Sequence, residues 1–361
     1  MNDFQKWNEA FRQQNLFIFN NDEKGILWLK TRAVCRSKQL KQFIEKAGIS
    51  LTSTKLAAQF EELYLLLERE PENAIKLDSF LRDQNNEWYR LKNVDEEKLI
   101  TDLRKIDTYE WGGDQENSLD QYIIRRYVKI ICNLEELERV SDEIKQNTWN
   151  FVRTSWYNNW TSYIIESYFK RNSRVLSAIG EIKSVDFFID NYPIDLKVTY
   201  FPDAFMADKV KEILGKHELT WIKQQAKEKG ISPDKNLSDK DQKKYLLEEL
   251  ENHHASEVIK TLKDARSTVI QDAITNPIEL ITWLYENQSA RLFGAENRLF
   301  VVLIDSTDLT QSWKMKRAFS IMKPKIETYL KDFSPASLKT INFTFGGKAY
   351  RSLSDIIFIT K

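Results

Sequence analysis

The 361-residue sequence is poor in the residues that build zinc sites, redox pairs and histidine-dependent hydrolases. It has only two cysteines, Cys35 and Cys132, which lie far apart and do not form a CxxC pair. Its only histidines are His217 and the adjacent His253 and His254. A structural zinc site or a serine–histidine triad is hard to assemble from so few ligands, and unpaired cysteines fit a reducing compartment.

Long apolar runs and an excess of charge of one sign are also missing. No stretch approaches the roughly 18 apolar residues of a membrane span, and the start, MNDFQKWNEAF, has no apolar signal region, so we expect a cytoplasmic protein. The 54 basic and 54 acidic residues cancel, so any nucleic-acid surface must come from local clustering. The FGGK stretch at 345–348 lacks the spacing of a phosphate-binding P-loop.

Hydrophobic periodicity divides the chain into helical and sheet-forming parts. Apolar spacings of three and four predict a helical domain over residues 1–149 that could read DNA, with a loop at 109–117. Residues 150–361 predict a mixed α/β core that is interrupted by a helical insertion over about 203–290. In the last third, RLFVVLID, TINFTF and SDIIFIT predict strands, and Pro324 should kink the helix between the first two.

The segment SVDFFIDNYPIDLKVTY, residues 184–200, predicts a β-hairpin with a turn near Asn191–Tyr192. This register pairs Phe188 with Asp195 and Asp186 with Lys197. One hairpin face then carries only apolar side chains, namely Val185, Phe187, Ile189, Ile194, Leu196 and Val198. The other face carries Asp186, Asp195 and Lys197, with Phe188 among them.

This polar face suits phosphodiester hydrolysis. Two carboxylates on neighbouring strands could share a hard cation such as Mg²⁺, which polarises a phosphate and acidifies a bound water. The Lys197 ammonium could orient that water or stabilise charge on the phosphate. The alternative is a cross-strand ion pair between Asp186 and Lys197 on a solvated surface.

The pattern of Asp186 followed by Asp195-Leu196-Lys197 resembles the PD-(D/E)xK nuclease superfamily, which includes many type II restriction endonucleases. Val185 stands where the family has proline, whereas the second element matches in full. The resemblance covers roughly a third of the chain. It implies a restriction-endonuclease-like core, with Asp186 and Asp195 as metal ligands and Glu166, an acidic residue on the preceding helix, as a further metal ligand and catalytic-site residue.

We therefore expect a Mg²⁺-dependent DNA endonuclease of a restriction-modification or phage-defence system, acting on double-stranded DNA. Cutting both strands favours a homodimer. Gln288, Arg291 and Arg298, near the start of the apolar strand, could contact phosphates or base edges, or simply cap a helix. Two alternatives remain open: a non-catalytic helical module that binds nucleic acid or protein, and a nuclease of the same fold acting on RNA, single strands or branched DNA.

Overall fold

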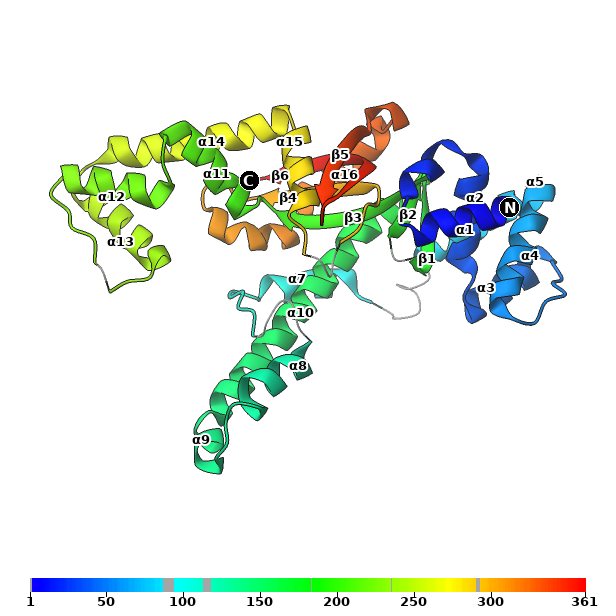
Figure 1. Ribbon diagram of the computed structural model, residues 1–361, viewed down its shortest axis with the longest axis horizontal. Coiled ribbons are helices and arrows are strands. Elements are labelled where there is room, and N and C mark those ends of the chain that lie inside the picture. The colour runs from blue at the N-terminus through cyan, green and yellow to red at the C-terminus, as the bar shows by residue number, and fades with distance from the viewer. Residues whose placement is uncertain (1, 87–93, 113–117, 183, 235, 290–292) are drawn as a thin grey trace.

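A mixed six-stranded sheet with helices on both faces forms the centre of the molecule (Figure 1). The computed structural model describes residues 2–86, 94–112, 118–182, 184–234, 236–289 and 293–361. The strand order is β1-β2-β3-β4-β6-β5. The strands are β1 (Val175–Ile182), β2 (Val185–Ile189), β3 (Tyr192–Tyr200), β4 (Arg298–Ile304), β5 (Lys339–Phe345) and β6 (Lys348–Thr360).

Helices fill the N-terminal part and the insertion, as their periodicity predicts. The N-terminal helices are α1 (Asp3–Arg12), η1 (Leu16–Asn21), α2 (Glu23–Val34), α3 (Ser37–Ala47), α4 (Leu56–Arg69), α5 (Pro71–Asp83), η2 (Gln84–Asn86), α7 (Glu96–Arg104), α8 (Leu119–Ile123), η3 (Ile124–Val128) and α9 (Leu134–Arg139). Then follow α10 (Ser141–Lys170), α11 (Asp203–Leu214), α12 (Glu218–Glu228), α13 (Asp239–Asn252), α14 (Ser256–Thr275), α15 (Ile278–Glu286), η5 (Leu309–Arg317), α16 (Phe319–Asp332) and η6 (Pro335–Ser337). The predicted loop at 109–117 is non-helical as far as Gly112, and the rest of it lies outside the described residues.

The predicted hairpin is present, but its register differs from our prediction. Ile189 pairs with Tyr192 and Phe187 with Ile194, so the two-residue turn is Asp190–Asn191 rather than Asn191–Tyr192. Both turn residues have positive φ, 46° and 75°. Such a turn needs left-handed backbone at both positions, which Asp and Asn tolerate far better than Tyr. The pairing ends at Phe187 and Ile194, and continuing this register by one residue places Asp186 opposite Asp195 rather than Lys197.

Strand β3 joins the hairpin to the parallel part of the sheet. It pairs antiparallel with β2 through residues 192–194 and parallel with β4 from Asp195 onward, where Asp195 is the partner of Arg298. Strand β6 continues the sheet parallel to β4 and folds back onto β5 at Gly346–Gly347. Both glycines have positive φ, which explains the tight turn predicted there. Strand β1 was not predicted, and α16 continues through Pro324.

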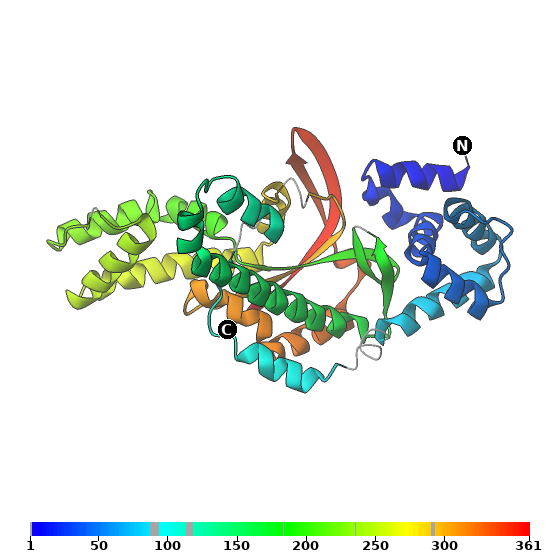
Figure 2. The ribbon, with the colours of Figure 1, turned by 90° about the horizontal axis from the view of Figure 1, so that it is seen from below.

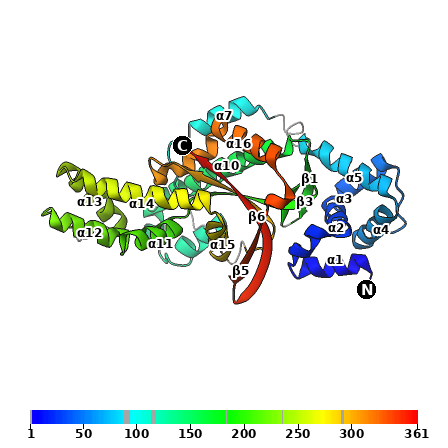
Figure 3. The same ribbon diagram turned by 90° about the horizontal axis from the view of Figure 1, so that it is seen from above.

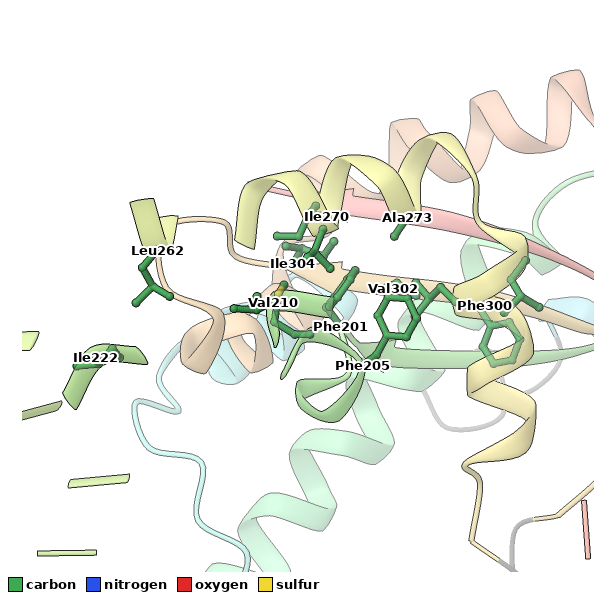
Figure 4. Packing of buried hydrophobic residues seen from close by; sticks show 14 of the residues in the cluster. Phe201, Phe205, Val210, Ile222, Leu262, Ile270, Ala273, Phe300, Val302 and Ile304 are labelled. Carbon is green, nitrogen blue, oxygen red and sulfur yellow. The ribbon is translucent and has the colours of Figure 1, made fainter. Parts of the chain in front are cut away.

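Each sheet face has its own hydrophobic core because β4 is buried on both sides. Leu299, Val301 and Leu303 pack with α10 and α16 on one face. Phe300, Val302 and Ile304 pack with α11, α14 and α15 on the other (Figure 4). The insertion thus completes the core of the second face before it extends away from the sheet (Figure 3).

The N-terminal helices α1–α5 cover the outer end of the sheet, opposite the insertion (Figure 3). Their core includes Leu176, Val185 and Phe188 from β1 and β2. The prediction that Val185 shares a face with Phe187 is therefore wrong. Val185 is the first residue of β2, directly after the positive φ of Ser184 and beside a register shift between β1 and β2, so regular alternation does not extend to the start of this strand.

The boundary predicted between residues 149 and 150 falls inside α10, which runs unbroken from Ser141 to Lys170.

Within the described ranges, no helix has both the length and the apolar character needed to span a membrane.

Phe188→Ala should lower the free energy of unfolding by about 3–5 kcal/mol, because Phe188 is completely buried between the hairpin and the N-terminal helices. Urea denaturation measures the change. Ile75→Ala, on an α5 side chain that is 71% exposed, is the control and should change stability by less than about 0.5 kcal/mol. Equal effects of the two substitutions would contradict the packing described.

Candidate active site

The Asp186 carboxylate lies at the point where β2 stops pairing with β3. Its Oδ2 accepts a hydrogen bond of 2.8 Å from the backbone N–H of Leu196, between Asp195 and Lys197. Burial, followed by the negative charges of Asp195 and Glu166, raises the pKa of Asp186 to about 6. A carboxylate of this kind is poised to gain a cation or a proton near neutral pH.

The Asp195 carboxylate is buried and held between two cations. Lys197 Nζ lies 3.0 Å from both of its oxygens, and Arg298 Nε lies 3.2 Å from Oδ2. The Arg298 side chain is itself only 4% exposed, and its other nitrogens donate to Glu296 and Gln288 at 3.1 and 2.8 Å. Asp195 and Arg298 are therefore a buried ion pair across the parallel strands β3 and β4.

The Lys197 side chain is 43% exposed and can leave Asp195 without unfolding the sheet. It borders a pocket of about 850 Å³ that follows β3 from Lys197 to Tyr200 and continues to Trp283 of α15 and Trp313 of η5. Arg298 borders the same pocket but is only 4% exposed, so Lys197 is the more accessible cation beside Asp195.

Glu166 approaches Asp186 from α10, closely enough for its charge to raise the pKa of Asp186. It forms an ion pair with Lys170 one turn later and borders a cavity of about 270 Å³ beside β1. The four predicted site residues, Asp186, Asp195, Lys197 and Glu166, are therefore neighbours, although they come from three elements.

Arg298 has a different position from the one expected of a DNA-contacting residue. It is buried against Asp195, and Gln288 is the acceptor that helps to fix it. Arg291 lies outside the described residues. Sequence reasoning missed this partnership, because no local pattern reveals which residue of β4 pairs with Asp195.

Asn297 also supports the site and was not predicted. Its backbone carbonyl accepts from the Asp195 N–H at 2.8 Å, and its side-chain amide donates to Pro193 O at 3.0 Å. Its Oδ1 accepts from the Leu353 N–H at 3.1 Å. One buried amide therefore ties β3, β4 and β6 together at the level of the carboxylates.

The carboxylates of the site meet the needs of a hard divalent cation only in part. In the described portion of the chain, no three His, Cys, Asp or Glu side chains are arranged to hold a metal ion. Mg²⁺, however, commonly binds through one or two carboxylates and completes its shell with water. Asp186 and Asp195 fit such a two-carboxylate site, provided that the Lys197 ammonium gives up its contact with Asp195.

In comparisons with protein-family models, with curated proteins and with solved structures, nothing matched the chain. The site is therefore interpreted from its own geometry.

Asp186→Asn should stabilise the metal-free protein at pH 7.5 but not at pH 4. The folded-state pKa is raised from 3.8 to about 6, so the stability contributed by the bound proton is full below about 3.8 and lost as the pH rises to 6. The difference between these two pKa values corresponds to about 3 kcal/mol. Asparagine removes the charge and keeps an acceptor for Leu196 N–H.

Urea denaturation at the two pH values tests this expectation, with Asp107→Asn, at an exposed carboxylate, as the control. A variant that is less stable than wild type at pH 7.5 would show that the Asp186 charge is well compensated, contrary to the geometry described.

Arg298→Met should destabilise the fold by about 3–5 kcal/mol, because it leaves the buried Asp195 carboxylate without its internal cation. Adding Asp195→Asn should recover part of that loss, since the Asp195 position then carries no unpaired charge, whereas Glu296, which is 14% exposed, still lacks its Arg298 partner. Simple additivity of the two single substitutions in denaturation experiments would argue against a coupled buried pair.

Proposed function

We propose that this protein is a Mg²⁺-dependent DNA endonuclease, of the type II restriction or phage-defence class. One observation carries the proposal: Asp186 and Asp195 converge beside Lys197, and the Asp195 charge helps to raise the pKa of Asp186 to about 6. Two carboxylates that repel each other next to a reachable ammonium are costly for folding and useful for binding a cation and a phosphate.

Asp186 and Asp195 would hold the metal ion, which when bound polarises a phosphate and acidifies a coordinated water. Lys197 would turn from Asp195 toward the phosphate and stabilise the negative charge that develops on its oxygens. Arg298 would hold Asp195 in position while Lys197 moves. Glu166 would hold a water or a second ion on the α10 side of Asp186.

The pocket beside Lys197 favours a substrate that lies along β3. From Asp195 onward, β3 pairs with β4, whereas its pairing with β2 covers residues 192–194, and residues 197–200 of β3 border the pocket. Its aromatic lining, including Tyr109, Trp283 and Trp313, suits nucleotide units next to a scissile phosphate. We propose double-stranded DNA as the substrate that binds in this pocket.

Plasmid and phage DNA should be cut in the presence of Mg²⁺, and EDTA should abolish cleavage. Asp186→Asn and Asp195→Asn should remove activity, because each deletes one of two anionic ligands. Lys197→Met should lower the single-turnover rate about 10²–10³-fold, as loss of a charge-stabilising group does. Lys348→Met, at the exposed β5–β6 turn, is the control and should cut like wild type.

The alternatives predict other results. Folded wild-type protein that binds DNA without metal and cuts neither modified nor unmodified DNA would favour a non-catalytic binding module. Cleavage of RNA, single strands or branched DNA, with intact duplex left uncut, would favour a nuclease of different substrate.

A further inference from the structure

A polar cavity of about 270 Å³ lies beside β1, on the α10 side of the candidate active site. Its walls come from α3, from η2 at the end of α5, from the second half of α10 and from β1. The view from below shows α10 running toward the hairpin strands and the N-terminal helices (Figure 2). Glu166 belongs both to this cavity and to the cluster around Asp186, so a ligand bound here lies next to that cluster.

Uncharged amide groups supply much of the polar lining of the cavity. Gln39 and Gln42 are three residues apart on α3 and therefore lie on the same face of that helix, and Gln84 joins them from η2. All three side chains are half-buried. In the part of the chain that the structure describes, none of these amides has a hydrogen-bond partner. Each can therefore offer a ligand one acceptor and two donors.

The buried residues Asn85 and Ser177 form a fixed polar part of the wall. Their exposed fractions are only 8% and 4%. Asn85 Nδ2 donates to Val175 O at 3.0 Å, and Asn85 Oδ1 accepts from Ser177 Oγ, so the amide plane of Asn85 is held in place. The second N–H of this amide has no acceptor among the described residues. A buried donor of this kind is costly until a ligand or a water meets it.

The charges around the cavity argue against a metal ion. Among the described lining residues, Glu166 is the only carboxylate, and it is already paired with Lys170. Hard cations favour several oxygen ligands, with carboxylates among them. Lys38 also borders the cavity, is exposed, and forms no ion pair with a described carboxylate, so its ammonium is available to a phosphate of a bound strand.

A single nucleobase matches this combination of size and chemical groups. The volume is just below the roughly 300–1,000 Å³ of pockets for small organic ligands, which leaves room for one base and not for a base pair. A glutamine or asparagine amide forms two hydrogen bonds with N6 and N7 of adenine. Tyr163 contributes an aromatic ring to the wall, and Ala178 and Ile179 contribute apolar contacts, as the faces of a base require.

We propose that this cavity binds one adenine base of the DNA after the base has turned out of the duplex. The amides of Gln42 and Gln84 bind the edge of the adenine, Tyr163 stacks on its ring, and Lys38 contacts the phosphate beside that nucleotide. The role in DNA rests on the proposed nuclease function, because Glu166 connects the cavity to the candidate metal site. The binding of a base can nevertheless be measured without cleavage.

Saturation-transfer NMR with 2′-deoxyadenosine and the full chain in EDTA tests base binding separately from cleavage. At millimolar nucleoside we expect transfer to the H2 and H8 protons of adenine with wild-type protein, and weaker transfer to deoxythymidine, which lacks the N6 amino group. Gln42→Leu/Gln84→Leu should bind deoxyadenosine about 10-fold more weakly, the effect of losing one good bidentate base contact. Gln271→Leu, at an exposed amide on α14, is the matched control and should bind like wild type.

Folded wild-type protein that shows no transfer from deoxyadenosine, or a cavity variant that binds it like wild type, would overturn the proposal. Displacement of the nucleoside by inorganic phosphate would overturn it as well, because the cavity would then bind an anion. Far-UV circular dichroism checks that each variant is folded. Nucleoside binding by a protein that cuts no DNA would support the cavity and refute the nuclease proposal alone, so the two failures are distinguishable.

Discussion

A buried ion pair between Asp195 and Arg298 crosses the sheet where β3 changes its partner strand. The two side chains are directly opposite across β3 and β4, and both are almost completely enclosed. Parallel pairing at this point also sets which residues of β4 enter each core, because a slip of one residue would exchange Leu299 and Phe300 between the two faces. The Asp195–Arg298 pair therefore depends on the same strand register that distributes the β4 side chains between the two cores.

Around this pair the chain keeps features that a purely structural sheet would avoid. Asp186 faces Asp195 although like charges repel, and its carboxylate replaces part of the strand ladder by accepting from Leu196 N–H. The free-energy cost of placing these two carboxylates together is confined to the site, because the cores on both faces of the sheet are apolar. A site that is strained in this way, beside a pocket that a substrate can enter, is the physical basis of the nuclease proposal.

The sequence identified the residues of the candidate site, but not the register in which their strands pair. Period-two alternation located the hairpin and placed Asp186, Asp195 and Lys197 together, because a register change of two residues leaves every side chain on its face. It missed the Asp190–Asn191 turn, the reversal at Val185 and strand β1. It could not find Arg298 or Asn297 as supports of Asp195, because parallel strands 100 residues apart leave no local signal of their register.

The most direct test of the account is a crystal structure of the protein with Mn²⁺, using anomalous scattering to locate the ion. We expect a peak between the carboxylates of Asp186 and Asp195, with Lys197 displaced from Asp195 and Arg298 unmoved. Crystals saturated with Mn²⁺ that show no ion at this site, with Lys197 still paired to Asp195, would contradict the central claim.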